Sequence, residues 1–172
     1  FKKNNGLVIG GTINKYNYIH VRFLPNIFHF NFRLRYFKTE LAKKVGSIKH
    51  GPYREILKMY NLDKSQIEII HTSDLPALSG LGSSSSSTVS AINAISTLKG
   101  SFINKKNLSN LAIKIEREVL GENVGCQDQI FSSFGGFNCI RFKSDVDFAV
   151  ENLINNKEKL SLLNNSSILV WS

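Results

Sequence analysis

Several short stretches of the chain alternate apolar and polar residues with a period of two, which predicts β-strands. Phe28, Phe30 and Phe32 alternate with polar residues within 28–36, so we expect a strand there with the three rings in the core. Further strands are predicted at 67–71 and 137–142, a hairpin is predicted to join 6–13 to 18–21, and the apolar end 168–171 indicates a strand cut short.

Other stretches carry apolar residues at the spacing of an α-helix. Apolar residues at 89–98 form such a stripe directly after a segment rich in Gly and Ser. A second stripe covers 108–119, and Gly121 follows where a helix commonly ends. A loop is predicted to follow over 121–128. Two shorter helices are predicted at 39–45 and 53–60.

Composition indicates one globular domain. The chain has 172 residues, of which 42% are hydrophobic, and no apolar run approaches the ~20 residues of a membrane helix. It begins at Phe1 without a Met or a signal peptide, so we expect it to start inside a longer cytoplasmic protein that does not bind membranes. Cys126 and Cys139 are expected to be free thiols.

The net charge of +9 is concentrated in the first part of the chain. Residues 1–64 hold 13 Lys and Arg against 3 Asp and Glu, whereas residues 65–172 hold 9 against 10. A basic segment attracts anions such as a phosphorylated metabolite or a nucleic acid. It also fits a solvated surface with no special partner.

The segment 76–85, Pro-Ala-Leu-Ser-Gly-Leu-Gly-Ser-Ser-Ser, is the strongest candidate for a binding site. Gly80 and Gly82 allow the backbone to approach a ligand closely, and the serines begin a helix whose free N–H groups attract anions. No Lys follows Gly82, so this is not a P-loop. A flexible Ser-rich linker is the alternative, but the apolar helix that follows disfavours it.

Two acidic residues complete a possible phosphoryl-transfer site. Asp128 lies in the segment 125–129, Gly-Cys-Gln-Asp-Gln, and is a candidate for the carboxylate beside an attacking hydroxyl. Glu116 is a candidate Mg²⁺ ligand opposite a loop serine. Taken alone, Asp128 also fits a turn residue, and Glu116 and Glu118 also fit a solvated helix face.

Together these segments resemble the GHMP kinases. The match continues in order through Glu116-Arg117, 125–129 and Phe134-Gly135-Gly136. The sequence is most similar to the heptose-7-phosphate kinases and the related L-fucokinases of this family. The resemblance implies an α+β N-terminal domain in which a mixed or antiparallel sheet packs against helices, and which spans the whole of 1–172.

The resemblance also implies the roles of single residues, with ATP and Mg²⁺ as cofactors. Asp128 would be the catalytic residue that takes or orients the proton of the sugar's anomeric hydroxyl. Ser83 and Glu116 would hold Mg²⁺, with Glu118 competing with Glu116 for that role. Lys15 is a weaker candidate for the substrate. The nucleotide would be bound by Gly80, Leu81, Gly82, Ser83, Ser84 and Ser85.

The implied substrate is a sugar phosphate, with a heptose 7-phosphate favoured over L-fucose, and a homodimer is a possible assembly. The family's first motif and its C-terminal domain are expected to lie outside 1–172. An RNA-binding domain or a degenerate kinase kept as a binding subunit are the alternatives. The RNA alternative is disfavoured because basic residues and aromatics do not interleave in clusters.

Overall fold

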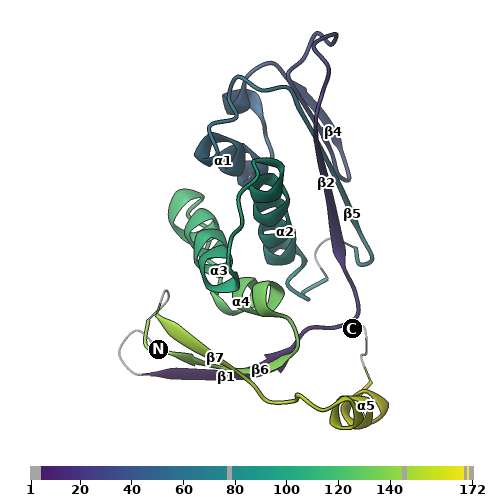
Figure 1. Cartoon of the computed structure of the whole chain (residues 1–172), viewed down its shortest axis with the longest axis vertical. Coiled ribbons are helices and arrows are strands. Elements are labelled where there is room, and N and C mark those ends of the chain that lie inside the picture. Colours follow the sequence, from purple (N-terminus) through teal and green to yellow (C-terminus); the bar gives the residue numbers. More distant parts are fainter. Residues whose placement is uncertain (1–4, 77–78, 145–146, 169, 171–172) are drawn as a thin grey trace. The chain divides into compact units, whose positions relative to one another are not determined.

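The computed structural model describes residues 5–76, 79–144, 147–168 and 170. The chain divides into two compact units, one formed by Asn14–Phe134 and the other by Phe1–Ile13 with Gly135–Ser172 (Figure 1). No helix in the described part of the chain is long and apolar enough to cross a membrane.

A four-stranded sheet organises the larger unit. Its strands are β2 (Asn17–Phe23), β3 (Phe32–Arg35), β4 (Thr39–Ala42) and β5 (Ile67–Ser73), in the order β2-β5-β3-β4. β5 runs antiparallel to β2 and parallel to β3, so the sheet is mixed. Ile69 lies opposite Val21 on one side and Leu34 on the other, which places these apolar side chains on the same face.

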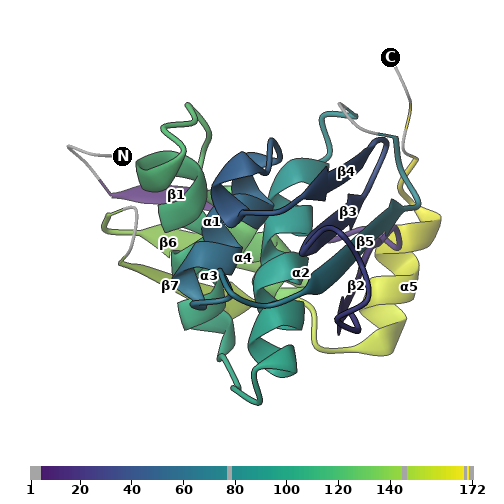
Figure 2. The same cartoon turned by 90° about the horizontal axis from the view of Figure 1, so that it is seen from above.

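Helices cover that apolar face in two tiers. α1 (Gly51–Met59) and α2 (Ser83–Leu98) lie next to the strands, and α3 (Lys105–Ile113) and α4 (Gln127–Phe134) pack against α2. A π-helix, Lys114–Val119, continues directly from α3. Seen from above, α1 and α2 lie on one side of the strands (Figure 2). Phe32, Tyr53, Ile56, Ile92 and Ile95 are fully buried in the resulting core.

The smaller unit contains a three-stranded antiparallel sheet. Its strands are β1 (Gly6–Gly11), β6 (Phe137–Phe142) and β7 (Phe148–Asn152), in the order β1-β6-β7, and α5 (Lys157–Asn165) follows. A Cβ atom on Gly11 would lie 2.8 Å from Cδ2 of Phe137, so a larger residue cannot fit beside that ring without a shift.

The structure confirms the α+β class and most of the predicted elements. The structure contains the predicted strands at 67–71 and 137–142. It also contains helices over the apolar stripes at 89–98 and 108–119, the second partly as the π-helix. Gly121 has the left-handed φ of +68° expected just after a helix. Cys126 and Cys139 are buried thiols rather than a disulfide, as expected. The helix predicted at 53–60 begins at Gly51.

Three predictions of secondary structure were wrong. No hairpin joins 6–13 to 18–21, because β1 pairs with β6 and β2 pairs with β5. The segment 39–45 is not a helix, since its first four residues form β4 and a single 3₁₀ turn follows at Val45–Ser47. The helix α4 was missed, because the loop was expected to continue to Asp128.

The aromatic strand predicted at 28–36 is shorter than expected. Only Phe32–Arg35 pairs as β3, and only Phe32 of the three rings is fully buried. Phe28 and Phe30 stack on each other with their centroids 5.1 Å apart, and the Arg33 guanidinium lies over both rings. At the chain end, Ile168 and Val170 are not in a strand, and Leu169 and Trp171 lie outside the described residues.

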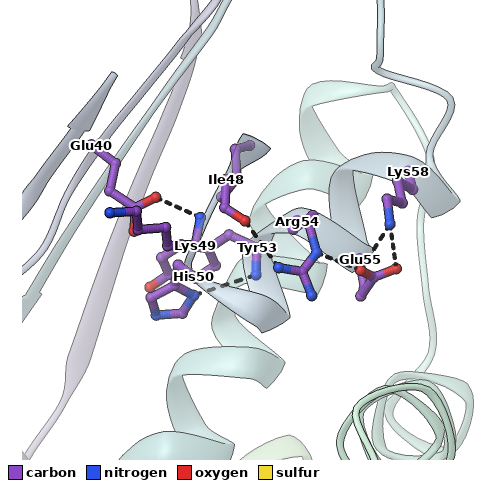
Figure 3. Close-up of polar contacts among 8 residues, drawn as sticks. All are labelled: Glu40, Ile48, Lys49, His50, Tyr53, Arg54, Glu55 and Lys58. Atoms are coloured by element: carbon purple, nitrogen blue, oxygen red, sulfur yellow. Dashed lines mark hydrogen bonds and ion pairs between the residues drawn. The ribbon is translucent and has the colours of Figure 1, made fainter. Parts of the chain in front are cut away.

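A histidine caps the start of α1, and the half-buried carboxylate of Glu40 orders the residue before it (Figure 3). His50 Nδ1 accepts a hydrogen bond from the Tyr53 N–H at 3.5 Å, and the two rings stack with centroids 3.8 Å apart. The Glu40 carboxylate accepts a bond from the Lys49 N–H at 2.7 Å. Burial lowers the pKa of His50 to about 4, which keeps its ring neutral.

This cap makes the fold sensitive to acid. The unfolded chain binds a proton at His50 near the ordinary pKa of 6.5, whereas the folded chain does so only near 4, so stability falls as pH drops between these values. The loss is at most about 3 kcal/mol for this residue. We expect His50→Asn, which keeps a capping oxygen that does not titrate, to flatten the dependence of unfolding free energy on pH. Urea denaturation between pH 7 and pH 4.5 measures it, and parallel curves for the two proteins would contradict the assignment.

Candidate active site

The Gly- and Ser-rich loop leads directly into α2. Gly80 and Gly82 have left-handed φ values of +72° and +69°, and Gly82 is the N-cap residue of the helix. Within the described residues no side chain caps the first turn of α2, which leaves its N–H groups and the positive end of the helix dipole available to an anion. Ala77 and Leu78 of the loop lie outside the described residues.

Asp128 lies against this loop. A Cβ atom on Gly82 would be 3.2 Å from the Asp128 Cγ and 3.3 Å from its Oδ2, so only glycine leaves room for the carboxylate. Asp128 is in the first turn of α4, and it is half-buried. Burial raises the pKa of Asp128 above its usual value, which makes it a stronger base than an exposed aspartate.

Glu116 occupies the interior of the same unit. Its side chain is only 1% exposed, so it is not the solvated residue that its charge alone would suggest. Its Oε2 accepts a hydrogen bond from Ser85 Oγ at 2.8 Å and another from Gln129 Nε2. Its Oε1 has no hydrogen-bond partner among the residues that the structure describes. Glu118, the other candidate for the metal ligand, is exposed, so burial distinguishes the two glutamates.

The π-helix determines where Glu116 points. Within Lys114–Val119 the hydrogen bonds span five residues, as in the bond from the Leu120 N–H to the Ile115 carbonyl at 2.9 Å. π-Helical segments are rare and are frequent at functional sites. Here the segment buries Glu116 beside α2 and α4 although its neighbours Lys114 and Glu118 are exposed.

These residues fit a magnesium ion. Five buried side-chain oxygens lack a hydrogen-bond partner among the described residues, and three of them belong to Ser79 of the loop, to Glu116 and to Gln129. The described residues contain no group of three or more His, Cys, Asp or Glu that holds a metal alone. Mg²⁺ commonly binds through one or two carboxylates together with substrate phosphates, so one buried glutamate beside an anion loop suits it.

The serines of the loop are placed differently from one another. Ser85 is the serine whose hydroxyl contacts Glu116. Ser83 is the residue expected to share a Mg²⁺ ion with Glu116. It is the first residue of α2, and its carbonyl accepts a hydrogen bond from Asn17 Nδ2 at 3.3 Å. Ser84 is exposed. The metal role of Ser83 therefore stays a prediction, as do the nucleotide contacts of Gly80, Leu81, Gly82, Ser83, Ser84 and Ser85.

Sequence reasoning missed two polar residues that support the site. Gln129 is fully buried and donates a hydrogen bond to Glu116. In the sequence, only its place in the Gln-Asp-Gln segment beside Asp128 pointed to a role in the site. Asn17 Oδ1 accepts a hydrogen bond from His71 Nε2 at 2.8 Å, and Asn17 Nδ2 donates to the Ser83 carbonyl, so Asn17 links β2 and β5 to the start of α2. Lys15 is exposed, and no contact among the described residues brings it to Asp128 or Glu116.

Comparison with known proteins identifies the family. The sequence model described as the GHMP kinases N terminal domain matches residues 40–136, which is more than half of the chain. The chain belongs to the GHMP kinase family. The matched segment of this GHMP kinase domain includes the loop, Glu116 and Asp128, and the resemblance drawn from the sequence is confirmed.

Relatives of this domain include kinases with different acceptors. It is 37% identical over 90 residues to a D-glycero-alpha-D-manno-heptose 7-phosphate kinase from Campylobacter jejuni, covering 52% of this chain and 26% of that protein. It is 34% identical over 103 residues to a mevalonate kinase from Pyrococcus horikoshii, covering 59% of this chain and 30% of that protein.

Solved structures confirm the fold. A D-glycero-D-manno-heptose 1-phosphate kinase from Bacteroides thetaiotaomicron superposes with a TM-score of 0.80 at 26% identity, covering 91% of this chain and 54% of that one. A sugar kinase structure from Campylobacter jejuni gives a TM-score of 0.72 at 23% identity, covering 91% and 52%. This GHMP kinase domain therefore spans about half the length of the structures that it matches.

The contact between Gly82 and Asp128 can be tested with a pair of matched variants. Alanine at Gly80 or at Gly82 adopts an unfavourable left-handed φ, which costs about 1 kcal/mol at either position. Only Gly82→Ala also pushes against Asp128, because no atom of the described residues lies within 4 Å of a Cβ atom at Gly80. We expect Gly82→Ala to lower the free energy of unfolding by about 1 to 2 kcal/mol more than Gly80→Ala. Equal losses in urea denaturation would show that the loop is not packed against Asp128.

Proposed function

We propose that the protein is an ATP-dependent kinase that phosphorylates a hydroxyl group, and that this chain carries its nucleotide-binding site. One observation supports this most directly. The uncapped start of α2 lies beside Asp128, and Glu116, with one unpartnered carboxylate oxygen, contacts the first turn of the same helix. An anion site, a metal ligand and a base are the groups that phosphoryl transfer requires from a protein.

The loop and α2 would bind the nucleotide phosphates. The free N–H groups of the first turn, together with the backbone around Gly80 and Gly82, donate to phosphate oxygens. Glu116 and a loop serine, Ser83 by prediction, would hold Mg²⁺ against them. When bound, Mg²⁺ neutralises the charge that develops on the transferred phosphoryl group. In this proposal ATP and Mg²⁺ are therefore the cofactors.

Asp128 would accept or orient the proton of the attacking hydroxyl. Its carboxylate lies beside the loop, where the terminal phosphate of a bound nucleotide would be close, and burial raises its pKa. A positioned general base contributes a factor of about 10² to 10⁴ to the rate. Asp128 therefore takes the catalytic role in this proposal.

For the acceptor, we favour the anomeric hydroxyl of a sugar phosphate, in particular a heptose 7-phosphate. The heptose 7-phosphate kinase from Campylobacter jejuni supports this choice, and so does the excess of Lys and Arg in residues 1–64, since a second phosphate needs cationic partners. The product would be a heptose 1,7-bisphosphate for the synthesis of nucleotide-activated heptose. A mevalonate-type acceptor is the second candidate, because mevalonate kinases match at 34% identity.

The role of Asp128 is tested by removing its charge. We expect Asp128→Asn to lower kcat by about 10² to 10⁴ in an assay of ADP release, with ATP binding retained because the asparagine keeps the shape of the side chain. Asp63→Asn is the matched control, since Asp63 is an exposed aspartate of the same unit. A variant at Asp128 that keeps full activity would overturn the catalytic assignment.

The acceptor is tested by presenting the full-length protein with Mg·ATP and a panel of alcohols. The panel contains heptose 7-phosphate, the unphosphorylated heptose, L-fucose and mevalonate. We expect the highest kcat/KM on heptose 7-phosphate, and a loss of at least about tenfold when its phosphate is absent. Turnover on mevalonate or L-fucose instead would keep the kinase and replace the substrate. A folded full-length protein with no turnover on any of them would contradict the kinase proposal.

A further inference from the structure

The buried carboxylate of Glu116 is held on one side only. Both of its donors, Ser85 Oγ and Gln129 Nε2, reach the same oxygen, Oε2. The other oxygen, Oε1, is buried and receives no hydrogen bond from the described part of the chain. An ionised carboxylate in the protein interior is stable only when it is paired or hydrogen-bonded, so the arrangement leaves half of the group for something else to satisfy.

We propose that Gln129 is the positioning residue that fixes the Glu116 carboxylate, so that Oε1 is presented to the divalent cation of the kinase. The inference rests on the proposed function, because it needs a cation at this place. Gln129 would act through Glu116 and would not contact the reacting atoms itself. Partners of this kind, which hold a metal-ligating side chain in one orientation, strongly affect metal affinity.

Packing alone does not account for a glutamine at this position. Gln129 is 0% exposed, and its own Oε1 is buried without a partner. A buried amide oxygen that receives no hydrogen bond is unfavourable, whereas an apolar side chain of the same length would fill the space without that cost. The amide is therefore accounted for by the bond that it donates to Glu116.

A neutral hydrogen-bond donor is better suited than a charged one to orient a carboxylate that binds a cation. Lysine or arginine at this position would form an ion pair with Glu116 and cancel the negative charge that attracts a cation. The Gln129 amide does not ionise, so it fixes the carboxylate and leaves its charge in place. The side-chain oxygen of Gln129, Oε1, is also an acceptor suited to the water molecules that Mg²⁺ commonly retains.

The fold holds Gln129 itself in place from the backbone side. It lies in the first turn of α4, one residue after Asp128, and its carbonyl accepts a hydrogen bond from Ser133 Oγ at 2.7 Å. Ile130, the next residue, is fully buried. The same helical turn thus carries the candidate base and the residue that orients the candidate metal ligand.

The experiment measures metal binding without turnover. Mn²⁺ is titrated into the full-length protein in the presence of a non-hydrolysable ATP analogue, and free Mn²⁺ is followed by electron paramagnetic resonance. We expect Gln129→Met, which keeps the length of the side chain but removes its donor, to raise the Mn²⁺ dissociation constant about 10- to 100-fold. Ser133→Ala is the matched control, because Ser133 is buried in the same helix and bonds the Gln129 backbone instead of Glu116. We expect it to leave the dissociation constant within about twofold of the wild type.

Thermal melting without metal establishes that each variant is folded, and Gln129→Asn replaces Gln129→Met if the latter is not. An unchanged dissociation constant in a folded Gln129 variant overturns the inference. An equal rise in Gln129→Met and Ser133→Ala also overturns it, since general loosening of α4 would then be the cause. In both cases the kinase proposal stands, provided that Glu116→Gln weakens Mn²⁺ binding. A wild-type protein that binds neither Mn²⁺ nor the nucleotide analogue contradicts the proposed function and this inference together.

Discussion

A single buried negative charge connects the parts of the candidate site. Glu116 is enclosed in the larger unit, and its carboxylate requires donors because an unpaired charge in the interior is costly. Those donors come from the first turn of α2 and the first turn of α4, which are 31 and 13 residues away in the sequence. The loop before α2 and the aspartate on α4 are brought together by the same packing.

The apolar core explains why this arrangement is held firmly. The sheet formed by β2, β3, β4 and β5 is covered on one face by α1 and α2, and residues of both layers are fully buried. α2 therefore has its body fixed in the core while its first turn remains uncapped. A helix that is anchored along its length can leave the N–H groups of its first turn unsatisfied for a ligand, because its stability comes from packing.

Much of this could be predicted from the sequence, since it depends on local patterns. The glycines before the helix, the apolar stripes and the acidic residues in Gly-rich segments are visible in the order of residues, and the family resemblance follows from them. The errors arose where distant residues decide the outcome. Segment 39–45 has helical spacing, yet its first residues pair with β3, and the pairing of β1 with β6 joins residues more than 120 positions apart. Likewise, the choice between Glu116 and Glu118 depends on which side chain is buried, and periodicity alone does not give that.

The wider turn of the π-helix sets the direction of Glu116 independently of the regular helix before it. An α-helix turns about 100° per residue, so one residue more or less between the apolar stripe of α3 and Glu116 would rotate Glu116 out of the site if the backbone stayed regular. A single wide turn absorbs such an added residue locally and leaves both ends of the helix where they were. An inserted residue in this stretch can therefore be accommodated without moving the Glu116 carboxylate away from Ser85 and Gln129, so the site tolerates a change in chain length that a regular helix would not.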